Sequence, residues 1–155
     1  MKYLPNDTTS YLVDPVEDRI LARLQEKHWD ALRTWSASVL GDIPATSKSV
    51  ITFRKTKGLP HSDTVYSKAE EFVRSLDIWA LTAMQCVTVE AKSFLVGLGV
   101  IKNFLNAEQA IGAARVEEEF QISNWGCVEG GHDYDRLNCS IQMRSAVFLL
   151  ATTRK

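Results

Sequence analysis

The feature that most constrains the fold is the segment from residue 78 to residue 101, which is apolar on nearly every side. A helix with one apolar stripe covers a core from one side, but a helix that is apolar all round must be enclosed by other elements. The segment therefore predicts the buried centre of a helical bundle. Thr88 and Val89 are weak helix formers, and Gly97 and Gly99 weaken the pattern further, so one helix or two helices remain open.

Residues that can cap a helix divide the rest of the chain into further helices. They precede runs of helical spacing at Asp14, Asp30, Ser62, Asp77, Asn106 and Asp133. Gly41 is placed to end the second helix, and the chain is expected to bend near Trp29. In the last helix, one face is expected to be lined by Tyr134, Leu137, Ile141 and Phe148.

The sequence predicts few strands. Residues 8–13 predict a short strand or an extended segment, and the long connection of residues 42–61 leaves room for a strand at residues 49–53. With 155 residues, one domain is expected. We predict a mainly α fold, a non-repeating helical bundle of about six or seven helices with at most one or two short strands.

Composition excludes several classes of function. The net charge is −1, which gives no reason to expect nucleic acid or an anionic membrane as a partner. The longest apolar runs, residues 94–101 and 146–151, are too short for a membrane span. Three widely spaced cysteines suggest neither a disulfide framework nor a zinc site, and a reducing compartment fits best.

The C-terminal third carries a run of acids inside a helical stripe. Residues at spacings of three and four are expected on one side of one helix; they are Ala107, Ile111, Ala114, Gln121 and Trp125. Continuing this rhythm from Ala114 leads to Glu118, whose charge must be paired, hydrogen-bonded or used there. Lys92 and the nearby Arg115 are its candidate partners. A structural ion pair and a charge held for a partner protein both remain open.

Trp125 and the pair His132-Asp133 are further candidates for binding residues. Most tryptophans in a small helical domain lie in the core, but Trp125 stands at a helix end beside Gly126 and is a candidate interface anchor. His132 and Asp133 most simply begin the last helix. Asp133 would then be the cap, and His132 would pack or bond across the turn.

The residues give little support to an enzyme. Glu118, Glu129, His132 and Asp133 could bind a metal ion, because carboxylates with histidine are suitable ligands. Helical two-metal proteins, however, repeat the Glu-x-x-His spacing on two helices, and here it occurs once, in a turn. No nucleophile has a recognisable base. We predict no catalytic residues, no metal and no cofactor; the alternative is a small metal-dependent hydrolase that uses Glu118, Glu129 and His132.

Three short motifs together resemble a known family. Residues 115–121 read Arg-Val-Glu-Glu-Glu-Phe-Gln, residues 125–129 read Trp-Gly-Cys-Val-Glu, and residues 132–133 read His-Asp. This combination resembles the C-terminal domain of the mitochondrial ATP synthase assembly chaperones that handle the α subunit of the catalytic sector. The resemblance covers nearly the whole chain and includes Gln25 with Trp29-Asp30. Val116 departs from the family's leucine, Ala31 from its proline and Leu12 from its arginine.

The resemblance implies a chaperone without chemistry of its own. Such a protein binds the unassembled α subunit of ATP synthase until β subunits replace it. The expected partner-binding residues are Glu118, Glu119, Gln121, Trp125, Glu129, His132, Asp133 and Lys92. Residues 1–155 would be one helical domain, the C-terminal part of a longer two-domain protein, with residues 1–13 as its linker or short strand. We expect a monomer in the mitochondrial matrix, or in the cytoplasm of a bacterium.

Overall fold

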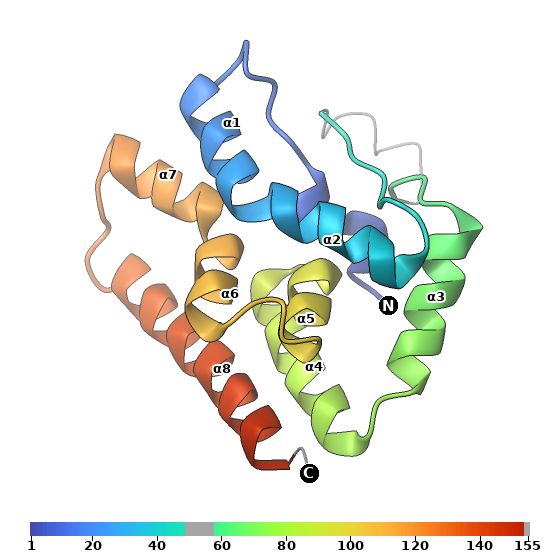
Figure 1. Cartoon of the computed structure of the whole chain (residues 1–155). Helices are drawn as coiled ribbons and strands as arrows, with labels where there is room; N and C mark the ends of the chain where they lie inside the picture. Colours follow the sequence, from blue (N-terminus) through green and yellow to red (C-terminus); the bar gives the residue numbers. More distant parts are fainter. Residues whose placement is uncertain (49–57, 154–155) are drawn as a thin grey trace.

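The computed structural model describes residues 1–48 and 58–153 of the chain. In these residues there are eight α-helices and no sheet (Figure 1). The helices are α1 (Arg19–Gln25), α2 (Ala31–Leu40), α3 (Asp63–Arg74), α4 (Ile78–Ala91), α5 (Phe94–Ile101), α6 (Ala107–Ala114), α7 (Val116–Trp125) and α8 (His132–Thr153). A π-helical turn, Glu26–Asp30, joins α1 and α2 into one rod. The described part therefore has seven helical rods, and the predicted mainly α, non-repeating bundle is confirmed.

The apolar segment at residues 78–101 forms two helices. Lys92 ends α4 in the left-handed conformation, with φ 51°, and the side chain of Ser93 accepts the Val96 N–H to start α5. All eight residues of α5 are buried, which confirms the predicted centre of the bundle. The first turn of α4 departs from the prediction, because Ile78 and Trp79 are exposed.

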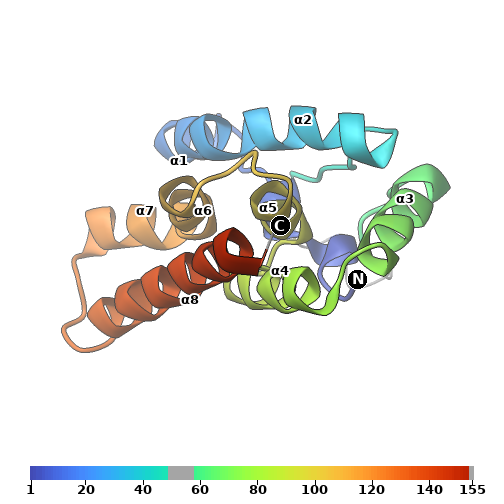
Figure 2. The same cartoon turned by 60° about the horizontal axis from the view of Figure 1, so that its bottom comes forward.

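The helices lie in three layers around α5. Figure 2 shows the α1–α2 rod above α5 and α6, with α4 and α8 below them. The two lower helices pack along each other and run in opposite directions, as the hydrogen bond from Asn138 to Glu90 also shows. None of the helices in the described residues is long and apolar enough to cross a membrane.

Several predicted helix ends are confirmed. The side chains of Ser62, Asp77 and Asn106 cap α3, α4 and α6, and Gln109 completes a capping box with Asn106. Gly41 ends α2 with φ 76°, a conformation that favours glycine.

Three other cap predictions are wrong. Asp14 lies in a turn, and the cap of α1 lies four residues later, where the Asp18 carboxylate accepts the backbone N–H groups of Ile20 and Leu21. Asp30 belongs to the π-helical turn and makes no cap hydrogen bond, so the helical backbone runs through it. The direction changes between α1 and α2 at this turn, as expected near Trp29 (Figure 1). Asp133 lies within α8, which begins at His132.

The short strand or extended segment expected at residues 8–13 is helical in its first half and extended at Tyr11. Thr8–Ser10 is a short 3-10 helix, and the Asp7 carboxylate accepts both the N–H and the hydroxyl of Thr9. The same buried carboxylate accepts the N–H of Leu95, which anchors the segment to α5. Tyr11 pairs with Ser47 in an isolated bridge. The strand expected at residues 49–53 lies outside the described residues.

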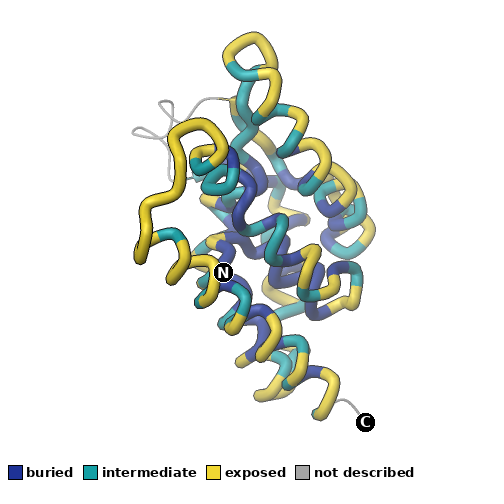
Figure 3. Tube along the Cα trace, turned by 90° about the vertical axis from the view of Figure 1, so that its left-hand side faces the viewer, coloured by how far each residue is buried: buried dark blue, intermediate teal, exposed yellow. Residues whose placement is uncertain are grey.

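The face predicted for α8 does form, but it points outward. The buried residues of α8 are Cys139, Met143, Ala146 and Leu150, and the expected set, Tyr134, Leu137, Ile141 and Phe148, is exposed. Figure 3 shows exposed and buried residues alternating along this helix. Both sets have helical spacing, so the period alone could not show which of them meets the core.

Candidate partner-binding cleft

The acidic run begins at a break between two helices. Arg115 separates α6 from α7 with φ −111° and ψ 11°, which is not helical. The rhythm of the stripe therefore does not continue beyond Ala114, and that part of the prediction is wrong. Val116 and Phe120 are buried on α7, whereas Gln121 and Trp125 are exposed.

Arg115 is the buried charge of the site. Its side chain is 6% exposed, compared with 30% for Glu118 and 43% for Glu119. Its guanidinium lies 2.7 Å from the Glu118 carboxylate and 3.0 Å from that of Glu119. These pairs, three and four residues apart, confirm the local pairing expected from the sequence.

The network continues from α7 to α8. Arg136 contacts both carboxylate oxygens of Glu119, at 2.9 Å and 2.6 Å. These hydrogen bonds, more than the pair with Arg115, hold the pKa of Glu119 below its usual value. Two cations thus hold Glu119, whereas the part of Glu118 that is exposed faces a cleft.

Of the two candidate partners of Glu118, Lys92 does not pair with it. Glu118 forms its ion pair with Arg115 in the described residues, and Lys92 is exposed at the end of α4. The backbone of Lys92 has a structural part, because its carbonyl accepts the N–H and the hydroxyl of Thr8 at 3.3 Å and 3.0 Å. A lysine at a helix break can reach solvent, so its charge needs no buried partner.

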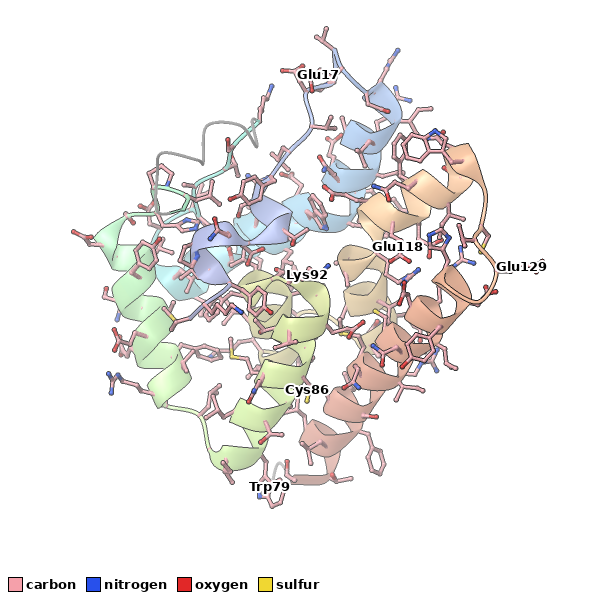
Figure 4. The ribbon with its side chains drawn as sticks, turned by 180° about the vertical axis from the view of Figure 1, so that it is seen from behind. Glu17, Trp79, Cys86, Lys92, Glu118 and Glu129 are labelled. Atoms are coloured by element: carbon pink, nitrogen blue, oxygen red, sulfur yellow. The ribbon has the colours of Figure 1, made fainter. Side chains whose placement is uncertain are left out.

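A cleft of about 520 Å³ opens between the end of α4, the start of α7 and the start of α8. We call it the acidic cleft. Its charged lining consists of the carboxylates Glu90, Glu117, Glu118 and Asp135 and the cations Lys92 and Arg115. Figure 4 shows Lys92 and Glu118 on this side of the molecule, and Glu129 farther out on the loop. Four carboxylates against two cations make the cleft attractive to a basic group.

Buried polar contacts position Glu117 at the edge of the cleft. Gln25 is buried, and its amide donates to Glu117 at 3.2 Å and accepts the Val13 N–H at 2.8 Å. Burial raises the pKa of Glu117, and the bond from Gln25 opposes the shift. One turn along, the buried Trp29 donates its indole N–H to the Ala113 carbonyl at 2.8 Å. Both side chains thus fix the base of the cleft.

The sequence interpretation missed three of the carboxylates. Glu117 belongs to the acidic run, but the expected helix register put Glu118, and not Glu117, on the apolar side. Glu90 could have been found by the argument applied to Lys92, because it is a charge in the same apolar segment. Asp135 gave no signal, since an acid in the first turn of a helix is usually solvated.

The other predicted residues lie outside the cleft, except Gln121, which lines it. Trp125 is 77% exposed and borders a neighbouring groove. Glu129 is exposed in the loop before α8. His132 bonds across that turn as expected, accepting the Val128 N–H at 3.0 Å on Nδ1. Trp125, Glu129 and His132 therefore lie around the loop that joins α7 to α8 and do not form one site with Glu118. We call this region the rim.

Comparison with known proteins shows similarity to proteins named Atp12, in sequence and in fold. No protein-family model matches the chain. The chain is 27% identical over 93 residues to the mitochondrial Atp12 protein of Schizosaccharomyces pombe, covering 59% of this chain and 32% of the relative. The crystal structure of Atp12 from Paracoccus denitrificans matches 98% of this chain, with 30% identity and a TM-score of 0.86. The chain is a homologue of Atp12 proteins.

Two further comparisons agree. The mitochondrial ATP12 protein of Saccharomyces cerevisiae is 27% identical over 101 residues, covering 58% of this chain and 31% of the relative. The Atu1473 protein of Agrobacterium tumefaciens has the same fold, with a TM-score of 0.80 at 21% identity, over 99% of this chain and 54% of that one. The chain spans about a third of the length of its curated Atp12 relatives and 61% of the Paracoccus chain.

The Atp12 relationship gives the hydrolase alternative no support, and neither does the geometry. Among the described residues, no three histidine, cysteine, aspartate or glutamate side chains gather as a metal site. Glu118 and Glu129 lie apart, the first at the acidic cleft and the second on the exposed loop (Figure 4).

Proposed function

We propose that this chain acts as an assembly chaperone of ATP synthase and binds the unassembled α subunit at the acidic cleft. The observation that carries this proposal is the partly exposed Glu118 at a net negative cleft, on the fold of an Atp12 protein. An unassembled subunit exposes surfaces that aggregate unless another protein covers them. A basic side chain on such a surface would fit the cleft.

The ion-pair network suits Glu118 for this exchange. Arg115 has a second carboxylate, that of Glu119, at 3.0 Å. Glu118 can therefore turn toward a cation of the partner without leaving the buried guanidinium unpaired. Glu119 has less freedom because Arg136 holds both of its oxygens. Glu118 is thus the contact residue, with Gln121 and Lys92 on the same lining and Trp125, Glu129, His132 and Asp133 on the rim.

The proposal includes further expectations. The chain performs no chemistry of its own, and it corresponds to the C-terminal helical domain of a longer chaperone. Two of its relatives are mitochondrial proteins by name, which supports a mitochondrial location, in the matrix, for a eukaryotic source. A bacterial source would place it in the cytoplasm.

Capture of the α subunit tests the proposal. The chain is tagged, co-expressed with the ATP synthase α subunit of the same source and captured, and added β subunit should displace the α subunit. Glu118→Lys should abolish capture. Glu71→Lys is the matched control, because Glu71 forms the same i,i+3 pair with Lys68, at 2.8 Å, on the distant helix α3.

The outcomes separate a binding residue from a structural one. The proposal requires that Glu118→Lys lose capture while its circular dichroism spectrum stays that of the wild type and Glu71→Lys keeps capture. Equal capture by both variants, with only the melting temperature lowered in Glu118→Lys, would make Glu118 a structural ion-pair member. A folded wild-type chain that captures nothing, beside a full-length Atp12 relative that does, would refute the role of this domain.

A further inference from the structure

A second hollow, of about 340 Å³, adjoins the acidic cleft between α7 and the segment that leads into α1. Glu117 and Gln121 line both hollows, so the two meet at these residues. We call the second hollow the apolar groove, after the side chains that form most of its lining: Tyr11, Leu12, Val13, Leu21, Phe120 and Trp125.

One buried side chain ties the two walls of the apolar groove together. Gln25 lines the groove and is 2% exposed. Its amide nitrogen donates to the Tyr11 carbonyl at 3.3 Å and to Glu117 on α7 at 3.2 Å. Its amide oxygen accepts the Val13 N–H at 2.8 Å. Both walls therefore hold their positions without a ligand, and binding at such a preformed site loses little free energy to ordering.

Trp125 forms the exposed wall of the groove. It is 77% exposed, whereas Phe120 on the same helix is 8% exposed. Covering an exposed indole with an apolar group removes apolar surface from water, which is favourable. Tryptophan is also enriched among the residues that contribute most to binding between proteins. The groove therefore suits an apolar side chain of a partner.

The charges of the apolar groove have the same sign as those of the acidic cleft. Glu17 and Glu117 line the groove, and Lys48 is the one cation among its described lining residues. Lys48 is already paired with Asp14, at 3.1 Å. The two arginines of α1 line a different hollow. A segment that places a basic group in the cleft is therefore not repelled where it continues into the groove.

The size of the groove favours an extended chain as its occupant. Its 340 Å³ correspond to a sphere about 9 Å across, and a helix with its side chains measures about 10–12 Å. Glu118 and Trp125 are seven residues apart on α7, which is about 10 Å along the helix. An extended chain advances about 3.3 Å per residue, and alternate residues lie on one side. Side chains that reach both positions should thus stand roughly two or four residues apart.

We propose that one extended segment of the α subunit occupies both hollows, with a basic side chain at Glu118 and an apolar side chain against Trp125. Because it takes the α subunit as the occupant, this assignment rests on the proposed function. It adds the chemistry of the segment that is bound: a basic and an apolar residue, roughly two or four positions apart. The occupant follows from the shared lining of the two hollows, since a chain bound in the cleft meets the groove next.

Capture of the co-expressed α subunit by the full chain tests the groove separately from the cleft. Trp125→Ala should lower the captured α subunit at least about tenfold with an unchanged circular dichroism spectrum. Trp125→Phe keeps an aromatic wall and should restore most of the capture. Trp79→Ala is the control, because Trp79 is 53% exposed at the opposite end of α4 from the cleft (Figure 4), and it should capture as the wild type does.

The outcomes distinguish the groove from the proposed function. Full capture by Trp125→Ala, with capture lost in Glu118→Lys, would overturn the groove assignment and leave the proposed function standing. An equal loss in Trp79→Ala would also overturn it, since the effect would not belong to the groove. A wild type that captures no α subunit, beside a full-length Atp12 relative that does, would refute both.

Photo-crosslinking tests whether one segment occupies both hollows. Glu17 lines the groove and Gln121 lines both hollows, and both side chains are exposed. A benzophenone amino acid at position 17 and one at position 121 should form adducts with the α subunit within about ten residues of each other. Adducts in separate parts of the α subunit, or none from position 17, would overturn the proposal. Adducts that stay within the chain would assign the groove to the protein itself and overturn it as well.

Discussion

Replacing Arg115 with methionine should cost much more stability than replacing a carboxylate that it holds. Arg115 stands at the break between α6 and α7, where its buried guanidinium pairs with Glu118 and Glu119. Arg115→Met leaves both carboxylates without this cation. Glu118→Gln removes one negative charge, and Glu119 remains at 3.0 Å to neutralise the guanidinium. The two substitutions therefore test the same network from its buried and its exposed end.

The burial of the three side chains sets the magnitudes. Breaking a fully buried ion pair costs about 3–5 kcal/mol, but water reaches Glu118 and Glu119, so we expect about 2–4 kcal/mol for Arg115→Met. For Glu118→Gln, with its 30% exposed side chain, we expect less than about 1 kcal/mol. A chain of this size loses about 2–4 °C of melting temperature per kcal/mol. The melting temperature should therefore fall by roughly 5–15 °C in Arg115→Met and by at most about 4 °C in Glu118→Gln.

Urea unfolding followed by circular dichroism measures both free energies, and the slope of unfolding with urea should stay the same. Glu71→Gln serves as the reference for loss of a surface i,i+3 pair. If Glu118→Gln destabilised the chain as much as Arg115→Met, Glu118 would be needed to hold the fold. The assignment of Glu118 as an exchangeable contact would then be wrong.

Three further predictions concern buried contacts. Burial raises the pKa of Glu117 in the folded chain. The stability that protonated Glu117 contributes is therefore full below its unfolded pKa of 4.5 and is lost as the pH rises through its folded pKa. Glu117→Gln should raise the melting temperature at pH 7 and leave it unchanged near pH 4. Trp29→Phe leaves the Ala113 carbonyl without its donor and should cost about 2–3 kcal/mol in urea unfolding. A Cβ at Gly97 would clash with the Thr88 hydroxyl, so Gly97→Ala should cost about 1–3 kcal/mol by the same assay. Gly131→Ala is the control and should cost no stability, because a Cβ there would meet no atom nearer than 3.6 Å.

The sequence predicted the centre of the fold because local signals there agree with the tertiary structure. Ser62, Asp77 and Asn106 have cap side chains directly before apolar periods, and each caps a helix. The break at Lys92 was open in the sequence because the segment is apolar on both sides of it. Packing against Thr8 and the Ser93 cap decide it, and those contacts are not visible in a local pattern.

The helical period leaves the packed side of a helix open where two sets of residues fit it equally. On α8, the inner set beginning at Cys139 and the outer set beginning at Tyr134 both have helical spacing, and neighbouring helices choose between them. At the acidic run, the break at Arg115 shifts the register of everything that follows. Glu118 was correctly singled out as a charge near the core, but the side chain buried there is that of Arg115.

Site-specific photo-crosslinking tests whether the α subunit occupies the acidic cleft. Gln121 is exposed and lines the cleft, so a benzophenone amino acid placed there should not disturb the fold. We expect a covalent adduct with the co-expressed α subunit from position 121 and none from position 71 on α3. Capture of the α subunit with an adduct from position 71 alone would contradict the claim.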